Sequence, residues 1–296
     1  MKTFILTLIM CLHLSANAIE FTVMHGPGGV SDITTRFLSE QMGSNEYQVV
    51  NRPGAGGRIA LRHMQQENTM LLATMVQVFV TNPINFKDLE HVPDRDFTVL
   101  ATIATMPSVL VCNKKTNINT YKDFQDNKKP LTFGVAGYGS SEHIATEILI
   151  KKVKTPHLIV PYSLGGSSSI INLLGGHIDC MFANFPTIRS HLANVNVLLS
   201  SHDIGVSMTW KDVYNESFPF DSYLAVIVPT NMSKDKKSKI TQDISTVFKN
   251  KDYNKSLFNL GLFPNSSTDS KMLEKARLNN ISVDKFITEN NIRTGQ

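Results

Sequence analysis

The sequence predicts an α/β protein built from two similar domains, with a hinge and a cleft between them. Three observations support this fold class. Short apolar runs alternate with amphipathic segments along nearly the whole chain, which is typical of strands alternating with helices. The order strand, glycine-rich turn, helix occurs twice, once at the start of each predicted unit. Two apolar stretches, 98–104 and 222–228, lie where the chain is expected to cross between the units, and paired crossings make a hinge.

The first unit starts with an apolar strand that runs into the glycine-rich turn 26–29. A helix is expected to begin at Ser31 or Asp32, because apolar residues then recur at helical spacing. A second glycine-rich turn at 51–57 precedes a short helix. The strands of this unit are predicted at residues 21–24, 47–50 and 70–73. This βαβαβ order predicts a parallel sheet.

The second unit repeats this order after a glycine-rich turn at 137–141. Helices are expected to follow this turn and to cover 167–174 and 186–192, the former stopped by Gly175 and Gly176. Strands are predicted at 131–136, 158–160, 178–183, 195–200 and 224–228. After the last strand we expect helices only. The crossings place the first domain at 19–104 plus 224–296 and the second domain at 105–223.

The first 18 residues have the layout of a cleavable signal peptide. Lys2 is a short basic region, residues 4–14 are largely apolar, and Ala16 and Ala18 supply small residues before a cleavage site. The apolar run is shorter than the roughly 20 residues that span a bilayer. We therefore expect export to the periplasm, with cleavage after Ala18 and a soluble mature chain.

The charge pattern gives no support for nucleic-acid binding. The formal net charge is +4 over 296 residues, and the lysine-rich run 234–239 is typical of a solvated helix face. The chain has no phosphate-binding loop and no complete dinucleotide fingerprint. We expect a monomer that binds a small molecule and uses no cofactor or metal.

Two cysteines remain after the expected cleavage, Cys112 and Cys180, and their spacing is not that of metal ligands. In the periplasm they can form one disulfide. The alternative is two buried apolar thiols within strands, and we favour this alternative.

The two glycine-rich turns that open the units have the chemistry of anion sites. Backbone N–H groups at the start of a helix point toward one spot, and the helix dipole adds partial positive charge there. A carboxylate can bind at such a turn without Arg or Lys. Glycines let the backbone approach a ligand, and Ser31 or Asp32 can cap the first helix. Similar turns occur without a ligand, so a purely structural role stays open.

Several motifs occur together in a specific order. Residues 26–32 read Gly-Pro-Gly-Gly-Val-Ser-Asp, and residues 51–57 read Asn-Arg-Pro-Gly-Ala-Gly-Gly. Residues 137–143 read Gly-Tyr-Gly-Ser-Ser-Glu-His, and residues 173–179 read Leu-Leu-Gly-Gly-His-Ile-Asp. This series resembles the tripartite tricarboxylate transporter receptors, also called the Bug solute receptors, from Phe21 to about Ile292.

The resemblance implies two Rossmann-like domains in a fold like that of type II periplasmic binding proteins. It also implies a receptor that binds a small carboxylate at the two turns, partly through ordered water, and delivers it to the membrane permease subunits of a tripartite transporter. Asp179 is expected to support the fold or hinge. Carried over by position, the residues expected near the ligand are Pro27, Gly28, Gly29, Val30, Ser31, Asp32, Gly137, Tyr138, Gly139, Ser140, Ser141, His143 and Tyr162.

Two stretches depart from the family's usual pattern. Thr74 and Met75 begin a largely apolar stretch where small polar residues are usual, and Asn184 stands near a position where relatives often carry an acid. These three residues are added to the expected ligand contacts. A more apolar cleft wall favours a ligand with one carboxylate and an apolar body. The alternative is that Met75, Val76 and Val78 pack in the core.

An enzyme would need a nucleophile with a base, paired carboxylates or a metal cluster. Ser140, Ser141 and His143 are the local candidates, but no third orienting group and no nucleophile-elbow pattern accompany them. We therefore expect no catalysis. A receptor that presents its ligand to a membrane sensor would have the same fold and site, so the sequence does not separate that role from transport.

Overall fold

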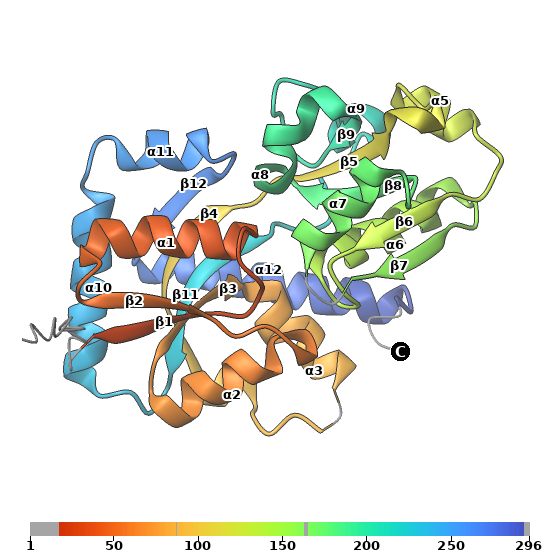
Figure 1. Ribbon diagram of the computed structural model, residues 1–296. Coiled ribbons are helices and arrows are strands. Elements are labelled where there is room, and N and C mark those ends of the chain that lie inside the picture. The colour runs from red at the N-terminus through yellow and green to blue at the C-terminus, as the bar shows by residue number, and fades with distance from the viewer. Residues whose placement is uncertain (1–17, 87, 163–164, 293–296) are drawn as a thin grey trace, which may run out of the picture.

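The computed structural model describes residues 18–86, 88–162 and 165–292 (Figure 1). All of the expected signal peptide except Ala18 lies outside these residues. The described chain forms two six-stranded sheets, each with helices packed on it. Two α/β domains are therefore confirmed.

The first sheet has the strand order β12-β4-β11-β3-β1-β2. Its strands are β1 (Ile19–Val23), β2 (Tyr47–Asn51), β3 (Met70–Thr74), β4 (Phe97–Thr105), β11 (Tyr223–Pro229) and β12 (Phe263–Ser267). β1 pairs in parallel with β2 and β3, as the βαβαβ order predicts. β11 is antiparallel to both β3 and β4, and β12 is antiparallel to β4. The sheet is mixed because the two crossing strands are built into it.

The second sheet has the order β10-β9-β5-β8-β6-β7. Its strands are β5 (Ser108–Asn113), β6 (Thr132–Val135), β7 (Leu158–Pro161), β8 (Cys180–Asn184), β9 (Val195–Ser200) and β10 (Met208–Thr209). β6 is parallel to β7 and β8, whereas β5 is antiparallel to β8 and β9. Asp179 supports this sheet, because its carboxylate accepts hydrogen bonds from the backbone N–H and hydroxyl of Thr132 at 2.8 and 2.7 Å.

Helices cover the faces and ends of the sheets. Those with the first sheet are α1 (Val30–Gly43), η1 (Ala55–Gly57), α2 (Arg58–Glu67), the π-helical η2 (Gln77–Thr81), α3 (Asn82–Asn85), α4 (Pro93–Asp96), α10 (Lys234–Phe248), α11 (Tyr253–Asn259) and α12 (Ser270–Glu289). Those with the second are η3 (Lys114–Thr116), α5 (Tyr121–Asp126), α6 (Ser141–Val153), α7 (Gly166–Gly175), α8 (Phe185–Ile188), η4 (Arg189–Asn194) and α9 (Trp210–Tyr214).

The expectation of helices alone after the last crossing strand is wrong, because β12 forms at the edge of the first sheet. Its sequence, Phe-Pro-Asn-Ser-Ser, lacks the apolar alternation that predicts a strand. Side-chain hydrogen bonds hold it instead. Thr102 Oγ1 donates to the Asn265 carbonyl, and Ser266 Oγ donates to the Ile103 carbonyl, both at 2.7 Å.

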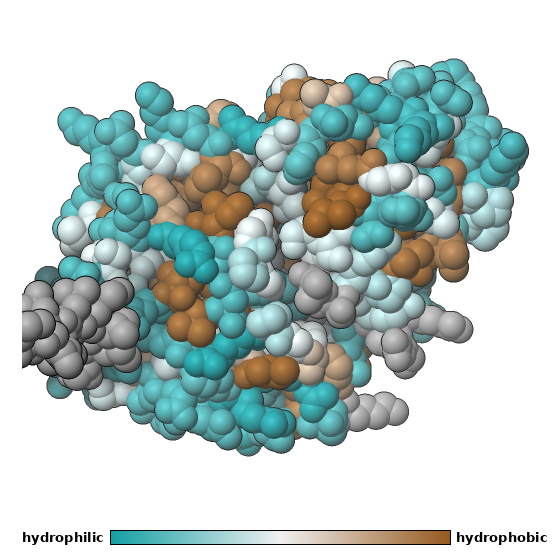
Figure 2. Space-filling model, viewed as in Figure 1, coloured by the Kyte–Doolittle hydropathy of each residue, from teal (hydrophilic) through white to brown (hydrophobic). Residues whose placement is uncertain are grey.

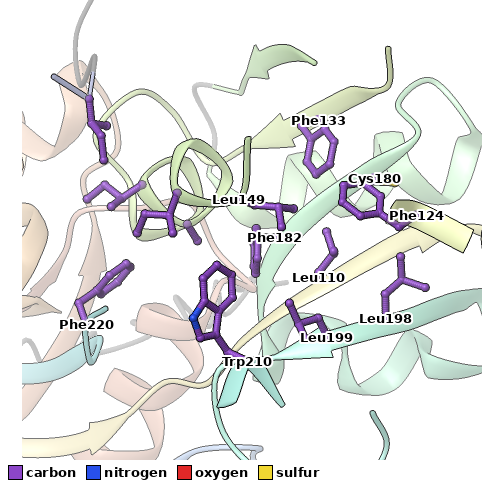
Figure 3. Packing of buried hydrophobic residues seen from close by; sticks show 14 of the residues in the cluster. Leu110, Phe124, Phe133, Leu149, Cys180, Phe182, Leu198, Leu199, Trp210 and Phe220 are labelled. Atoms are coloured by element: carbon purple, nitrogen blue, oxygen red, sulfur yellow. The ribbon is translucent and has the colours of Figure 1, made fainter. Parts of the chain in front are cut away.

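The largest core cluster surrounds Trp210 on the second sheet (Figure 3). α12 reaches this cluster as well as the first sheet. Ala276 packs with residues of the first sheet, whereas Val283 and Ile287 pack in the cluster around Trp210. Figure 1 shows α12 running from the first lobe toward the second. The two lobes therefore share a helix in addition to the crossing strands.

Cys112 and Cys180 form a disulfide between β5 and β8, and the prediction of two free thiols is wrong. Both residues are fully buried in strands, as expected. They face one another in the antiparallel register of the two strands. That register joins segments 68 residues apart, so the sequence alone did not reveal that the two sulfurs meet.

Candidate functional site

A polar cleft lies between the two lobes. The first lobe contributes His25, Gly26, Gly29, Val30, Ser31, Thr74, Gln77 and Met106. The second lobe contributes Ala136, Ser140, Ser141, Glu142, Gly166, Ser167, Asn184 and Thr187. Most of these residues follow the carboxyl ends of strands, where open α/β sheets bind ligands.

The first wall of the cleft is the turn between β1 and α1. α1 begins at Val30 with Gly29 as its N-cap, so the expected cap by Ser31 or Asp32 is wrong. Asp32 braces the loop instead. Its carboxylate accepts hydrogen bonds from the Gly28 N–H and from Asn51, both at 2.9 Å, and pairs with Arg36. Desolvation opposes its charge, but these partners lower the pKa of Asp32 below its usual value.

The second wall is the turn between β6 and α6. Ser140 is the N-cap of α6, and its hydroxyl accepts the His143 N–H at 3.2 Å. His143 Nδ1 accepts the Gly139 N–H at 3.1 Å, and its ring meets that of Tyr138 edge to face. His143 therefore stabilises this loop without lining the cleft. Gly139 has φ +77°, a conformation that side chains rarely adopt, and it lies tightly against Asn85 of the other lobe.

A third helix also begins at the cleft, although it was not predicted to contribute to the site. α7 starts with Gly166 and Ser167, and both residues line the cleft. Its N-cap, Gly165, has φ +89°, and a Cβ there would lie 3.5 Å from the His25 ring of the first lobe. The Gly-Gly-Ser sequence after a strand was the available signal, because it repeats the pattern of the other two turns. Three helix N-termini therefore supply partial positive charge to one cleft.

The expected ligand residues fall into two groups. Those that line the cleft are Gly29, Val30, Ser31, Thr74, Ser140, Ser141 and Asn184. Those that do not are Pro27, Gly28, Asp32, Met75, Gly137, Tyr138, Gly139, His143 and Tyr162. Met75 and Val78 pack in the core of the first lobe and Val76 in the cluster around Trp210. The apolar stretch after β3 thus serves the core, and Thr74 and Gln77 face the cleft instead.

Glu142 is another cleft residue that the expected set left out. It is 7% exposed, on the first turn of α6. Its two carboxylate oxygens accept hydrogen bonds from Asn184 Nδ2 at 2.7 Å and from the Ser141 hydroxyl at 3.1 Å. Desolvation raises the pKa of the Glu142 carboxyl above its usual value. A carboxylate at this position would repel an anionic ligand, whereas the glycine-rich turns were predicted to bind one.

The His25 ring predicts an acid-sensitive fold. Burial lowers the pKa of His25 to about 4, whereas the unfolded chain takes up this proton near pH 6.5. The stabilising effect of neutral His25 is therefore complete above about pH 6.5 and is lost progressively as the pH falls to about 4. Unfolding midpoints in urea should fall over this interval.

The variant His25→Gln isolates this contribution, because it should show a smaller fall in midpoint between pH 7.5 and pH 4.5. Burial also lowers the pKa of His91 and His157. The slope of the wild-type urea midpoint against pH therefore has several sources. His177→Gln, at an exposed position, is the matched control and should keep the wild-type slope. Equal slopes for His25→Gln and the wild type would contradict the assignment.

The outer surface is mostly hydrophilic on the face that Figure 2 shows, and its hydrophobic residues lie in separate patches. Among residues 18–292, gaps excepted, no helix is both long and apolar enough to cross a membrane. The described side chains also form no group of three or more His, Cys, Asp or Glu placed to hold a metal ion.

Two α/β lobes around a cleft lined by helix N-termini define a fold like that of type II periplasmic binding proteins. The family model described as tripartite tricarboxylate transporter family receptor matches residues 35–291. The chain belongs to this family.

Solved structures of similar fold include the Rhodopseudomonas palustris protein Rpa4515 with adipate, at a TM-score of 0.87 and 18% identity, covering 96% of this chain and 100% of that one. MatC from Rhodopseudomonas palustris with bound malate has a TM-score of 0.81 at 18% identity, covering 92% and 98%. At these identities the likeness concerns the fold.

A relative described as the UPF0065 protein in the tcbD-tcbE intergenic region, from Pseudomonas sp. strain P51, is 29% identical over 185 residues. That match covers 59% of this chain and 54% of the relative. The chain thus matches about half the length of this curated relative.

Proposed function

We propose that the protein is a periplasmic receptor that captures a small carboxylate-bearing metabolite and delivers it to the membrane permease of a tripartite transporter. One observation carries the proposal: three helix N-termini meet at a cleft that, among the described residues, no Lys or Arg lines. Such a site binds a carboxylate through backbone N–H groups and hydroxyls. Two structures of similar fold hold adipate and malate, and the chain's family consists of transporter receptors.

A screen of mono-, di- and tricarboxylates by thermal shift tests this proposal. A ligand at a hundredfold excess over its dissociation constant should add about 3 kcal/mol to the free energy of unfolding. At least one small carboxylate should raise the melting temperature, whereas the matching uncharged amides should not. A screen in which no carboxylate stabilises the protein would contradict the proposal.

Export through a cleavable signal peptide is part of the proposal. The order of basic residue, apolar run and small residues supports cleavage after Ala18. The Cys112–Cys180 disulfide is independent support, because such bonds persist in oxidising compartments. Mass spectrometry of the periplasmic fraction should find a mature chain beginning at Ile19. A chain retained in the cytoplasm with its first residues intact would contradict this expectation.

We also propose that the protein works as a monomer whose lobes close about a hinge in β4 and β11, with boundaries at 19–104 plus 224–296 and 105–223. β4 leads directly into β5 of the second sheet, and β11 takes the chain back to the first sheet after β10 and α9. Two hydrogen bonds across the lobes fit a closing motion. Asn85 donates to the Tyr138 carbonyl at 3.5 Å, and Arg189 donates to the Phe258 carbonyl at 2.9 Å.

The proposed role is binding without turnover. The Ser141 hydroxyl donates a hydrogen bond to Glu142, and Nδ1 of the His143 ring accepts the Gly139 N–H, so the Ser–His pair considered from the sequence is not supported. Incubation with a bound carboxylate should return it unchanged by mass spectrometry. Deleting the gene should abolish uptake of the labelled ligand. Normal uptake with lost gene induction would instead favour presentation to a membrane sensor.

A further inference from the structure

Glu142 is an acid in a cleft without a basic partner. The other titratable side chain among the lining residues is His25. Burial lowers the pKa of His25 to about 4, so this ring is neutral at physiological pH. Among the described residues of the lining, no cationic side chain balances a negative charge on Glu142. A buried carboxylate without a counter-charge is costly, and a ligand that brings the cation relieves that cost.

Desolvation opposes the charged form of Glu142 and raises its pKa, whereas three neighbouring groups favour a carboxylate. Asn184 Nδ2 donates to Oε1, and the Ser141 hydroxyl donates to Oε2. Both oxygens thus accept hydrogen bonds, which is the pattern of the ionised form. A Cβ added at Gly166 would lie 3.6 Å from Glu142 Oε1, so this oxygen lies beside the N-terminus of α7. The dipole of that helix favours negative charge there.

Asn184 adds a second acceptor at the same place. The side-chain nitrogen of Asn184 donates to Glu142 Oε1, so the side-chain oxygen of Asn184 points away from Glu142. This Oδ1 atom is buried, and among the described residues it accepts no hydrogen bond. Asn184 itself is 8% exposed and lines the cleft. A buried acceptor without a donor is unfavourable, and a donor on the ligand relieves that cost.

The cleft therefore has two chemically different ends. Gly29, Val30 and Ser31 place the N-terminus of α1 at one wall, where no acidic side chain among the lining residues competes for it. Glu142 occupies the position beside α7 and, with Asn184, presents acceptors. A ligand with a carboxylate at both ends would place its second negative charge against Glu142.

We propose that the cleft selects a small zwitterion, whose carboxylate binds at the N-terminus of α1 and whose ammonium group is accepted by Glu142 and Asn184. An ammonium group has three N–H donors and one positive charge, which matches two neighbouring acceptors, one of them anionic. This inference rests on the proposed role as a carboxylate receptor and specifies the ligand class as amino acids rather than dicarboxylic acids.

Matched probes test the inference by thermal shift and calorimetry. The probes are unbranched acids of three to six carbons, each as the monocarboxylate, the dicarboxylate, the 2-amino acid and the ω-amino acid. At least one amino acid should bind the wild type tenfold or more tighter than the monocarboxylate and dicarboxylate of the same length. In Glu142→Gln its affinity should fall by about thirtyfold. The dicarboxylate should gain affinity in the same variant, because the repelling charge is gone.

Glu40→Gln is the matched control. Glu40 is exposed on α1 and lies outside the cleft lining, so this variant loses the same charge. It should leave every affinity within about twofold, as for most surface changes. A wild type that prefers monocarboxylates or dicarboxylates to both amino acids overturns the zwitterion inference alone. So does a Glu142→Gln variant that keeps the amino acid's affinity. Absence of binding by every probe and by every carboxylate of the thermal-shift screen overturns the carboxylate receptor proposal itself.

Discussion

Loss of the Cys112–Cys180 disulfide is expected to lower the free energy of unfolding by about 4 kcal/mol. The bond closes a loop whose ends are 68 residues apart, and opening that loop returns conformational freedom to the unfolded chain. Typical domains are stable by about 5–15 kcal/mol, so this loss is a large share of the total. The reduced protein should unfold at a much lower urea concentration than the oxidised protein.

The double variant Cys112→Ala and Cys180→Ala separates the effect of losing the disulfide from any other effect of the reductant. Its midpoint in urea should lie close to that of the reduced wild type, lowered somewhat further because both residues are fully buried in the core. Adding a reductant should leave the variant unchanged. Equal midpoints for the oxidised and reduced wild type would show that the bond contributes nothing measurable.

The substitution Gly29→Val is expected to weaken carboxylate binding by roughly a hundredfold or more, about 3 kcal/mol. Gly29 lines the cleft as the N-cap of α1, with φ −78°. The backbone there accepts a side chain without strain, and an added Cβ would have its nearest neighbour, the Gly26 carbonyl oxygen, at 3.7 Å. The branched side chain would cover the N–H groups of the first helical turn.

Calorimetry with a ligand found by the screen measures this loss, and urea unfolding checks that the variant is folded. Ser44→Val is the matched control, since it adds an apolar branched side chain at the exposed opposite end of the same helix. This control should bind as the wild type does. A Gly29→Val variant that folds and keeps its affinity would show that the ligand does not bind at the N-terminus of α1.

The individual turns of the site could be predicted from the sequence, but their arrangement around one cleft could not. The turns before α1 and α6 were predicted because glycines after an apolar strand and before a helix leave a local pattern. The part played by α7 was not predicted, although Gly165, Gly166 and Ser167 carry similar residues. Its position depends on the strand order β8-β6-β7, which is a property of the whole sheet.

Two errors have the same physical origin in long-range contacts. Met75 looked like a cleft residue because it directly follows β3, but its side chain turns into the core of the first lobe. Glu142 was not among the expected ligand contacts. Its significance becomes visible only beside Asn184, which lies 42 residues away in the sequence and bonds to it.

The shared helix α12 also sets the order in which the protein can mature. Synthesis delivers the chain from its N-terminus, and domains generally fold as units as they emerge. Here the core around Trp210 needs Val283, Ile287 and Ile292, which are made well after the strands of the second sheet. We therefore expect neither lobe to reach its final packing before α12 has left the ribosome. The nascent chain would stay loosely folded until then, which is the condition in which a polypeptide can still be threaded to another compartment.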